Sequence, residues 1–304
     1  MTFFLTSTIR MAVPLMIAAL GLVLSERAGL MNIGVEGIML LGCFFSFFTS
    51  YRTGNVWLGL LAGLAAGLVG SLVFAVCSIT FKASQIVVGC AMNMLGSGLT
   101  AVMFRKYFMD QDVNGALSSS FQNMPIPLLS KIPIVGDALF NHNIIVYIGF
   151  ILVAVVWFVM NRTSIGIKVI AVGEHPKAAD SMGINVFRVR YLATAFSGLM
   201  MGLAGTYLAI AQSNTFQTDM TGGKGYIAMA VVVLGQWKPE GVLIGALIFG
   251  ASNALQMTIQ NSNLNIQYNL VLAIPYIVTV VAVLISGRKH IMDASAKGTP
   301  YIKS

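Results

Sequence analysis

The sequence predicts an all-α polytopic membrane protein with about nine transmembrane helices, built as a single transmembrane domain over residues 1–304. Hydrophobic residues make up 57% of the chain and charged residues only 9%, whereas a soluble domain carries roughly 25% charged residues. Apolar runs of membrane-spanning length recur from one end of the chain to the other, as expected of helices that cross a bilayer core of about 30 Å. The bilayer is therefore the expected solvent of this chain.

Each predicted helix corresponds to one apolar run between polar or glycine-containing breaks. No convincing small-x-small cleavage site follows the first run, which favours a membrane helix over a cleaved signal peptide. The seventh run is short, so we expect it to be tilted or partly re-entrant. The predicted helices lie at about residues 5–24, 30–50, 56–81, 84–104, 143–161, 189–211, 222–236, 239–257 and 267–286.

The basic residues predict the orientation, because cytoplasmic loops carry an excess of Lys and Arg. With residues 162–190 placed inside, twelve of the 18 basic residues are cytoplasmic. This predicts an external N-terminus, an extracellular loop at 105–142, a cytoplasmic loop at 162–190 and a cytoplasmic tail at 287–304. Because the net charge of +8 is scattered in this way, it predicts no nucleic-acid-binding patch. The inside residues are Arg27, Lys82, Arg162, Lys168, Lys177, Arg188, Arg190, Lys238, Arg288, Lys289, Lys297 and Lys303.

Small residues recur at helical spacing in several predicted spans. Glycines follow one another every four residues at Gly59, Gly63 and Gly67, and again at Gly198 and Gly202. Such faces let two helices approach closely, so we expect them at helix–helix contacts. A Glu-Gly pair also begins two of the predicted helices, at Glu36 and at Glu240. Both helices are expected to start from the cytoplasmic face, where an acid in the first turn complements the helix dipole.

The polar stretch 162–190 contains a segment with the chemistry of a short helix. Pro176 suits a first helical position, Ala178 and Ala179 favour helix, and Gly183 suits a helix stop. A short, charged, alanine-rich helix on one face of a membrane protein fits a groove on a soluble partner. An ordinary solvated loop is the alternative interpretation.

The chemistry missing from the sequence narrows the function. No G-x-x-x-x-G-K-[ST] phosphate loop is present, and no histidine lies within a predicted span, so the chain is expected not to be an ATPase or another enzyme. No metal site is predicted. Intramembrane carboxylates and histidines, which ion-coupled transporters usually need, are scarce.

Neutral hydrogen-bonding side chains are present in the spans instead, and these suit a polar, uncharged solute. Each of them has inter-helix hydrogen bonding as its alternative role. The predicted solute path comprises Asn32 and Glu36, at a break before the second helix, with Asn93, Ser97, Gln212 and Asn253.

Three ordered blocks of the chain resemble permease subunits of ABC importers, in the family that serves branched-chain amino acids, simple sugars such as ribose, and nucleosides. The first is Glu26–Gly42 (ERAGLMNIGVEGIMLLG), and the second is Gly173–Ile184 (GEHPKAADSMGI). The third begins at Gly223-x-Gly225-Tyr226 and continues to Gly241-x-x-x-Gly245. The version of the first block is most similar to that of nucleoside (guanosine-type) permeases.

The resemblance implies a specific assembly in a bacterial plasma membrane. A second, related permease subunit would complete the pathway, two ATP-binding subunits would dock below, and an extracellular solute-binding lipoprotein would deliver the solute. ATP and Mg would bind the ATPase subunits, and this chain would hold no cofactor. The implied coupling residues are Glu174, His175, Lys177, Ala178, Ala179, Gly183 and Ile184.

Other functions remain open at this point. Within the same transporter class the solute could be ribose, another simple sugar or a branched-chain amino acid. From another class, a stand-alone secondary transporter or a channel would work without ATP or partner proteins.

Overall fold

The computed structural model describes residues 2–108, 120–125 and 141–260, together with positions 275, 277, 278, 280, 281, 284, 297–299 and 301. Two π-helical stretches, η1 (Val76–Thr80) and η3 (Tyr207–Ser213), follow directly on α3 and α9, and β1 (Asn123–Pro125) pairs antiparallel with β2 (Asn141–Asn143). The α-helices are α1 (Thr2–Arg27), α2 (Val35–Thr53), α3 (Val56–Ala75), α4 (Gln85–Phe108), α6 (Ile144–Arg162), α7 (Ser164–Glu174), α8 (Pro176–Ser181), α9 (Val186–Thr206), α10 (Lys224–Leu234) and α11 (Pro239–Gln260).

The described residues confirm a helical, multi-span chain. Six helices in this part of the chain are long and apolar enough to cross a membrane: Phe3–Arg27, Val56–Thr80, Gln85–Phe108, Ile144–Arg162, Val186–Ser213 and Pro239–Gln260. Each coincides with one predicted span. The count of nine and the orientation stay predictions, because most of 267–286 and of 287–304 lies outside the described residues, as does most of 105–142.

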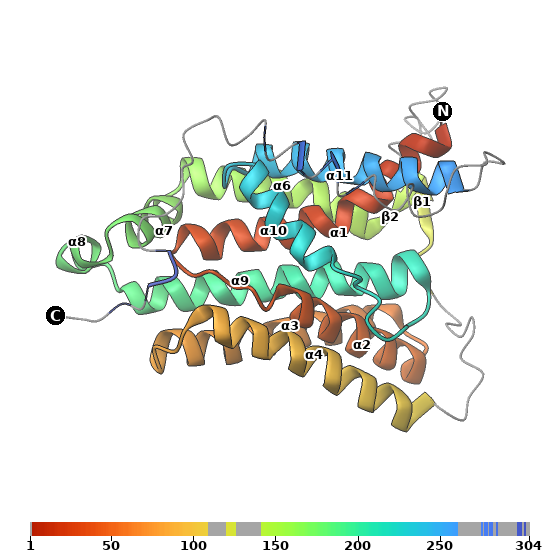
Figure 1. The fold of residues 1–304 in the computed structure, drawn as a ribbon, viewed down its shortest axis with the longest axis horizontal. Coiled ribbons are helices and arrows are strands. Elements are labelled where there is room, and N and C mark those ends of the chain that lie inside the picture. Colours follow the sequence, from red (N-terminus) through yellow and green to blue (C-terminus); the bar gives the residue numbers. More distant parts are fainter. Residues whose placement is uncertain are drawn as a thin grey trace.

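The long helices run side by side, with α8 projecting beyond one end of the bundle and α1 beginning at the other (Figure 1). Helices α1 and α9 form the centre, since 83% of the membrane-spanning window of each is buried. Helices α4 and α6 are peripheral, with 22% and 28% buried. Below, the end of the bundle from which α8 projects is called the α8 end.

Glycine contacts bring the central helices together, as the spacing predicts. A Cβ atom added at Gly67 of α3 would meet the backbone of Gly198 and Gly202 on α9, and one added at Gly42 of α2 would lie 2.9 Å from Cα of Gly202. Three helices therefore meet almost backbone to backbone. Any side chain at these positions would separate them.

Helix α2 does not begin at the face where α1 ends. The prediction that the helix beginning at Glu36 starts from the cytoplasmic face is therefore wrong. The Gln85 side chain, at the start of α4, accepts a hydrogen bond from the Met31 N–H, whereas Asn93, eight residues further along α4, accepts one from the Gly37 N–H. Eight residues of α-helix advance about 12 Å, so the segment between α1 and α2 carries the chain into the bundle (Figure 1). A positive φ of 87° at Gly29 permits this re-entry.

Helix α10 is an 11-residue helix, as the shortness of the seventh predicted span suggests. Its length of about 16 Å is roughly half of a bilayer core. Figure 1 shows that α10 also begins midway along the bundle and ends towards the α8 end, where it turns into α11. Two helices, α2 and α10, therefore have their N-termini inside the protein.

Candidate functional site

A cluster of polar side chains lies where α2 and α10 begin. We call it the mid-bundle polar cluster, and its members are Asn32, Glu36, Asn93, Ser97, Asp219 and Tyr226. At its centre, the two carboxylate oxygens of Glu36 accept hydrogen bonds from the backbone N–H groups of Gly223 (2.7 Å) and Gly225 (2.6 Å). These N–H groups belong to the positive end of α10, where an anion is favoured. Glu36 therefore caps a helix far away in the sequence.

The side chain of Asn93 joins three segments of this cluster. Its amide oxygen accepts from the Gly37 N–H at 2.9 Å. Its amide nitrogen donates to the Ile33 carbonyl at 3.1 Å and to the Tyr226 hydroxyl at 2.8 Å. Tyr226 is 48% exposed, so this hydrogen bond leaves about half of the residue uncovered.

A second polar contact extends the cluster by one turn of α4. The Ser97 hydroxyl donates to the Asp219 carboxylate at 2.6 Å. Asp219 lies in the loop before α10 with a positive φ of 57°, a conformation that Asp tolerates better than most residues. The cluster thus contains the two carboxylates of Glu36 and Asp219, together with amide groups, hydroxyl groups and an exposed aromatic ring.

Three of the six residues predicted to line a solute path, Glu36, Asn93 and Ser97, take part in the contacts above. Asn32 lies buried just before α2, where its side chain accepts a hydrogen bond from the Gly34 N–H. Gln212 instead donates to the Met11 sulfur on α1 at 3.3 Å, and Asn253 lies half-buried on α11. Sequence reasoning missed Asp219 and Tyr226. The Gly-x-Gly-Tyr block could have indicated Tyr226, since it is part of the resemblance.

Helix α8 has the start and stop that its sequence predicts. Pro176 occupies a first helical position. Gly183 follows the helix with a φ of 83°, and the N–H groups of Gly183 and Ile184 bond to the carbonyls of Asp180 and Ala179. This is a Schellman motif, a common way to end a helix. Glu174, one of the implied coupling residues, lies outside this helix because it is the last residue of α7.

The two sides of α8 differ. Ala179 is only 4% exposed and packs against Val172, Val186 and Tyr301. The outward side consists of four exposed residues that we call the α8 outer face: His175, Lys177, Ala178 and Met182. Met182 is 83% exposed, which marks a flexible apolar side chain available for contact. Ala179 was expected to permit contact with a partner, but its methyl group points into the protein.

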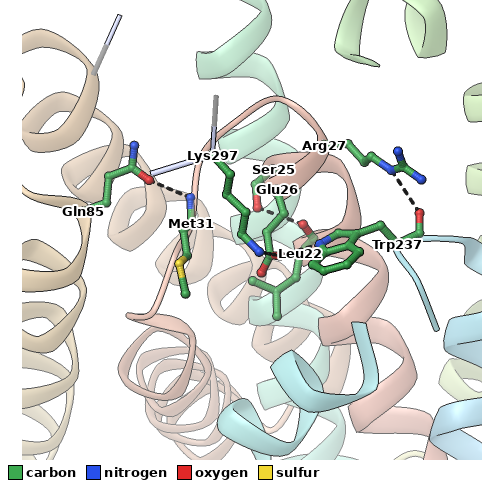
Figure 2. A network of polar contacts seen from close by, with 8 residues as sticks. All are labelled: Leu22, Ser25, Glu26, Arg27, Met31, Gln85, Trp237 and Lys297. Carbon is green, nitrogen blue, oxygen red and sulfur yellow. Dashed lines mark hydrogen bonds and ion pairs between the residues drawn. The ribbon is translucent and has the colours of Figure 1, made fainter. Parts of the chain in front are cut away.

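Polar contacts connect the end of α1 with the start of α4 and with the α10–α11 turn (Figure 2). The Glu26 carboxylate, at the end of α1, accepts a hydrogen bond from the Trp237 indole at 2.6 Å and pairs with Lys297 at 2.7 Å. Arg27 donates to the Trp237 carbonyl at 3.3 Å. Trp237 lies in the α10–α11 turn with a positive φ of 53°, which persists only where surrounding contacts hold it.

Residues 297–299 and 301, which we call the tail segment, extend this network to α8. Gly298 donates its N–H to the Gly29 carbonyl, and Arg190 of α9 donates to the carbonyls of Ala28 and Thr299. The Tyr301 ring packs edge to face against the Phe187 ring, with 5.5 Å between the ring centroids. Burial and a hydrogen bond to the Asp180 carboxylate raise the pKa of Tyr301 above its ordinary value, although Arg190 opposes this. Its hydroxyl therefore remains protonated at neutral pH.

Multiple apolar spans, two helix starts inside the bundle and a polar cluster between them define a class of protein: a membrane protein built for solute passage. Residues 4–283 match the family described as the permease component of branched-chain amino acid transport systems. The match covers most of the chain, so this chain belongs to that family and is a permease subunit of an ABC transporter.

Curated relatives extend over nearly the whole chain. The guanosine ABC transporter permease protein NupQ of Bacillus subtilis is 38% identical, over 98% of this chain and 95% of its own length. The nucleoside ABC transporter permease protein NupC of Lactococcus lactis is 30% identical, over 96% and 94%. TsgC13 of Haloferax volcanii, whose name assigns it provisionally to glucose transport, is 39% identical over 88% and 81%.

A solved structure shares the fold. It is an inward-facing ABC transporter described as of the metal-chelate type, with a TM-score of 0.50 and 16% sequence identity. The similarity covers 94% of this chain and 82% of that one. At this identity the comparison supports the helical arrangement alone.

Proposed function

We propose that this chain is the membrane-spanning subunit through which an ATP-driven importer moves a nucleoside across a bacterial plasma membrane. The observation that carries the proposal is the α8 outer face, which lies on a short helix projecting from one end of a multi-span bundle (Figure 1). We place this end in the cytoplasm, in keeping with the excess of Lys and Arg there.

The α8 outer face would dock in a cleft of an ATP-binding subunit, with Met182 and Ala178 at the contact. His175 and Lys177 add polar groups beside them. Closure of the ATPase pair would push α8 and shift the permease between inward- and outward-facing states. A second, related permease subunit would complete the pathway, and an extracellular solute-binding lipoprotein would supply the solute.

The tail segment offers a physical route for this push. Tyr301 packs on α8, while Lys297 reaches Glu26 and, through it, the α10–α11 turn at Trp237. From there α10 leads back to Glu36 in the mid-bundle polar cluster. Displacement of α8 would therefore be transmitted to the N-termini of α2 and α10, which meet at the Glu36 carboxylate. Such coupling requires a structural element with two alternative conformations, whose equilibrium depends on both the docking site and the solute site.

The mid-bundle polar cluster suits a neutral, polar solute with an aromatic or sugar face. The Tyr226 hydroxyl accepts from Asn93 and keeps its own O–H to donate to a solute, and the exposed Tyr226 ring offers a stacking surface. The similarity to NupQ and NupC favours a nucleoside. The similarity to TsgC13 makes glucose the second candidate.

The experiment is ATP-driven uptake by the complete complex in liposomes, with ATP hydrolysis measured in parallel. Ala178→Trp and Met182→Glu should lower uptake at least tenfold while the complex retains ATPase activity. Ala91→Trp, at an exposed alanine of α4 outside α8, is the matched control and should transport normally. Normal uptake in both α8 variants, with normal assembly, would contradict docking through the α8 outer face.

The same liposomes separate the two solutes. Guanosine should stimulate ATP hydrolysis and accumulate, and unlabelled glucose should not compete with it. If glucose rather than guanosine stimulates ATP hydrolysis and accumulates, the transported solute is a sugar and the nucleoside proposal is wrong.

A further inference from the structure

A groove between α6, α7 and α9 lies outside both the mid-bundle polar cluster and the α8 outer face. Its volume is about 480 Å³. Val155 and Val159 of α6, Ile165 of α7 and Leu192 of α9 form its apolar walls, and Lys168 and Arg188 stand among its lining residues. No Asp or Glu is part of the lining. We call it the α6–α7–α9 groove.

The apolar walls of this groove open to the outside of the bundle. Leu192 is 71% exposed and Ile165 is 57% exposed. Both lie on or beside helices that belong to membrane-spanning segments, and α6 and α9 are themselves two of the six spans. Side chains of this size are exposed on such a surface because hydrocarbon, rather than water, covers them.

The basic residues lie at one end of the groove, and its apolar walls extend from there into the membrane-spanning segments. Arg188 is the third residue of α9, and Leu192 lies one turn further in. On α6, Val155 is seven residues from the helix end at Arg162, which corresponds to about 10 Å. The cations therefore stand at the α8 end, and the apolar walls extend from there into the span.

The two cations are available to a ligand. Both side chains are exposed, and neither forms an ion pair with any residue in the part of the chain that the structure describes. Their apolar stems line the groove while their charged ends reach the rim, as long basic side chains do at membrane interfaces.

From this order of charge and apolar surface we infer that the α6–α7–α9 groove is a binding site for an anionic glycerophospholipid. The headgroup phosphate would lie between Lys168 and Arg188, and one acyl chain would lie along Val155, Val159 and Leu192. Basic pockets between helices on the cytoplasmic side recognise anionic headgroups in this way. A second protein subunit is the competing occupant, but an apolar wall behind unpaired cations matches a phospholipid in both charge and polarity.

The inference rests on the proposed function in one respect: the proposed function places the α8 end in the cytoplasm, and the lipid would therefore belong to the cytoplasmic leaflet. The lipid would brace α7, which precedes the coupling helix, against α9. It would thus hold the base of α8 in a fixed place while an ATPase subunit pushes on its outer face.

The test is native mass spectrometry of the detergent-purified transporter complex, titrated with phosphatidylglycerol or with phosphatidylcholine. The wild-type complex should retain phosphatidylglycerol in preference to phosphatidylcholine. Lys168→Gln combined with Arg188→Gln should weaken phosphatidylglycerol retention about 10- to 30-fold, given the contribution of each basic residue near an anionic headgroup. Leu192→Trp, which fills the groove without changing charge, should lower retention of both lipids.

The matched control is Lys82→Gln combined with Lys238→Gln, which removes two exposed cations that do not line the groove. It should change retention less than twofold. Equal retention of both lipids by the wild type, unchanged retention in the Lys168/Arg188 variant, or an equal loss in the control would each overturn the site. So would a wild-type complex that retains no lipid because a second permease subunit covers the groove.

This readout is independent of transport. If the wild-type complex retains phosphatidylglycerol as expected but accumulates no solute with ATP, the proposed function fails and the lipid site stands. If it transports normally and retains no anionic lipid, the lipid site fails alone.

Discussion

At the scale of single residues, Glu36 illustrates how one side chain organises distant segments. Its carboxylate holds two backbone N–H groups at the start of α10 while its own backbone lies in the first turn of α2. Glu240, in the corresponding Glu-Gly pair, begins α11 and is exposed. The same two-residue pattern therefore has two different structural roles.

Replacing Glu36 with Gln should destabilise the protein and abolish uptake. The amide keeps one acceptor oxygen, but its NH₂ group would face a backbone N–H, leaving one donor at the start of α10 unsatisfied. A buried unsatisfied donor costs about 1–3 kcal/mol. The melting temperature of the purified complex measures the loss. Glu240→Gln is the control, and equal melting of the two variants would argue against the role assigned to Glu36.

At the scale of helices, close glycine contacts decide how α3 and α9 pack. A Cβ atom added at Gly202 would meet the Gly63 carbonyl, whereas one added at Gly98 of α4 would meet nothing within 4 Å. Both are helical glycines in spans. The difference between them lies only in what the fold places opposite.

Gly202→Leu should lower stability by at least about 1–3 kcal/mol, the usual cost of overpacking a well-packed core, and the complex should express poorly. Gly98→Leu should leave both unchanged, since its side chain enters open space. Thermal melting of the two variants in the same detergent gives the comparison. A Gly98 variant as unstable as the Gly202 variant would show that the close contact opposite Gly202 is not the cause, since leucine favours helix over glycine at both positions.

The tail segment is an element whose importance only its contacts reveal. Lys297 neutralises the buried Glu26, and the two side chains are 11% and 3% exposed, respectively. Lys297→Gln would remove the counter-ion of the buried Glu26 carboxylate and leave it the Trp237 N–H, and removing one partner of a buried ion pair costs up to about 3–5 kcal/mol. We expect reduced coupling, seen as more ATP hydrolysed per solute imported.

A charge-swapped double variant, Glu26→Lys with Lys297→Glu, checks whether the pair itself matters. Partial recovery of coupling relative to either single variant supports a direct pairing. Lys82→Gln, which removes a lysine charge at an exposed position, should leave coupling unchanged. If Lys297→Gln transports with wild-type stoichiometry, the tail segment has no part in transmission.

At the scale of the whole molecule, the chain is half of a pathway and carries no energy source of its own in the proposed function. The isolated subunit in liposomes should therefore accumulate no solute, with or without ATP. Addition of the ATP-binding subunits, the second permease and the solute-binding protein should restore accumulation. Concentrative uptake by the isolated chain would instead support a stand-alone secondary transporter.

The sequence by itself determined the features that arise from neighbouring residues. Apolar runs predicted the spans, Pro176 and Gly183 predicted the limits of α8, and glycine spacing predicted close helix contacts. These signals act over one or two helical turns, because helix caps and hydrophobic periodicity are local properties of the chain. The family resemblance added the blocks that contain Glu36 and Tyr226.

Only the tertiary structure decided which distant groups meet. Glu36 and Gly225 are 189 residues apart, and no local pattern at Glu36 specifies that it caps α10 rather than its own helix. The same holds for Ala179, which the alanine-rich pattern placed on a docking surface but which the fold turns towards Tyr301. In a bilayer every polar group needs an internal partner, and the three-dimensional arrangement of the helices selects that partner.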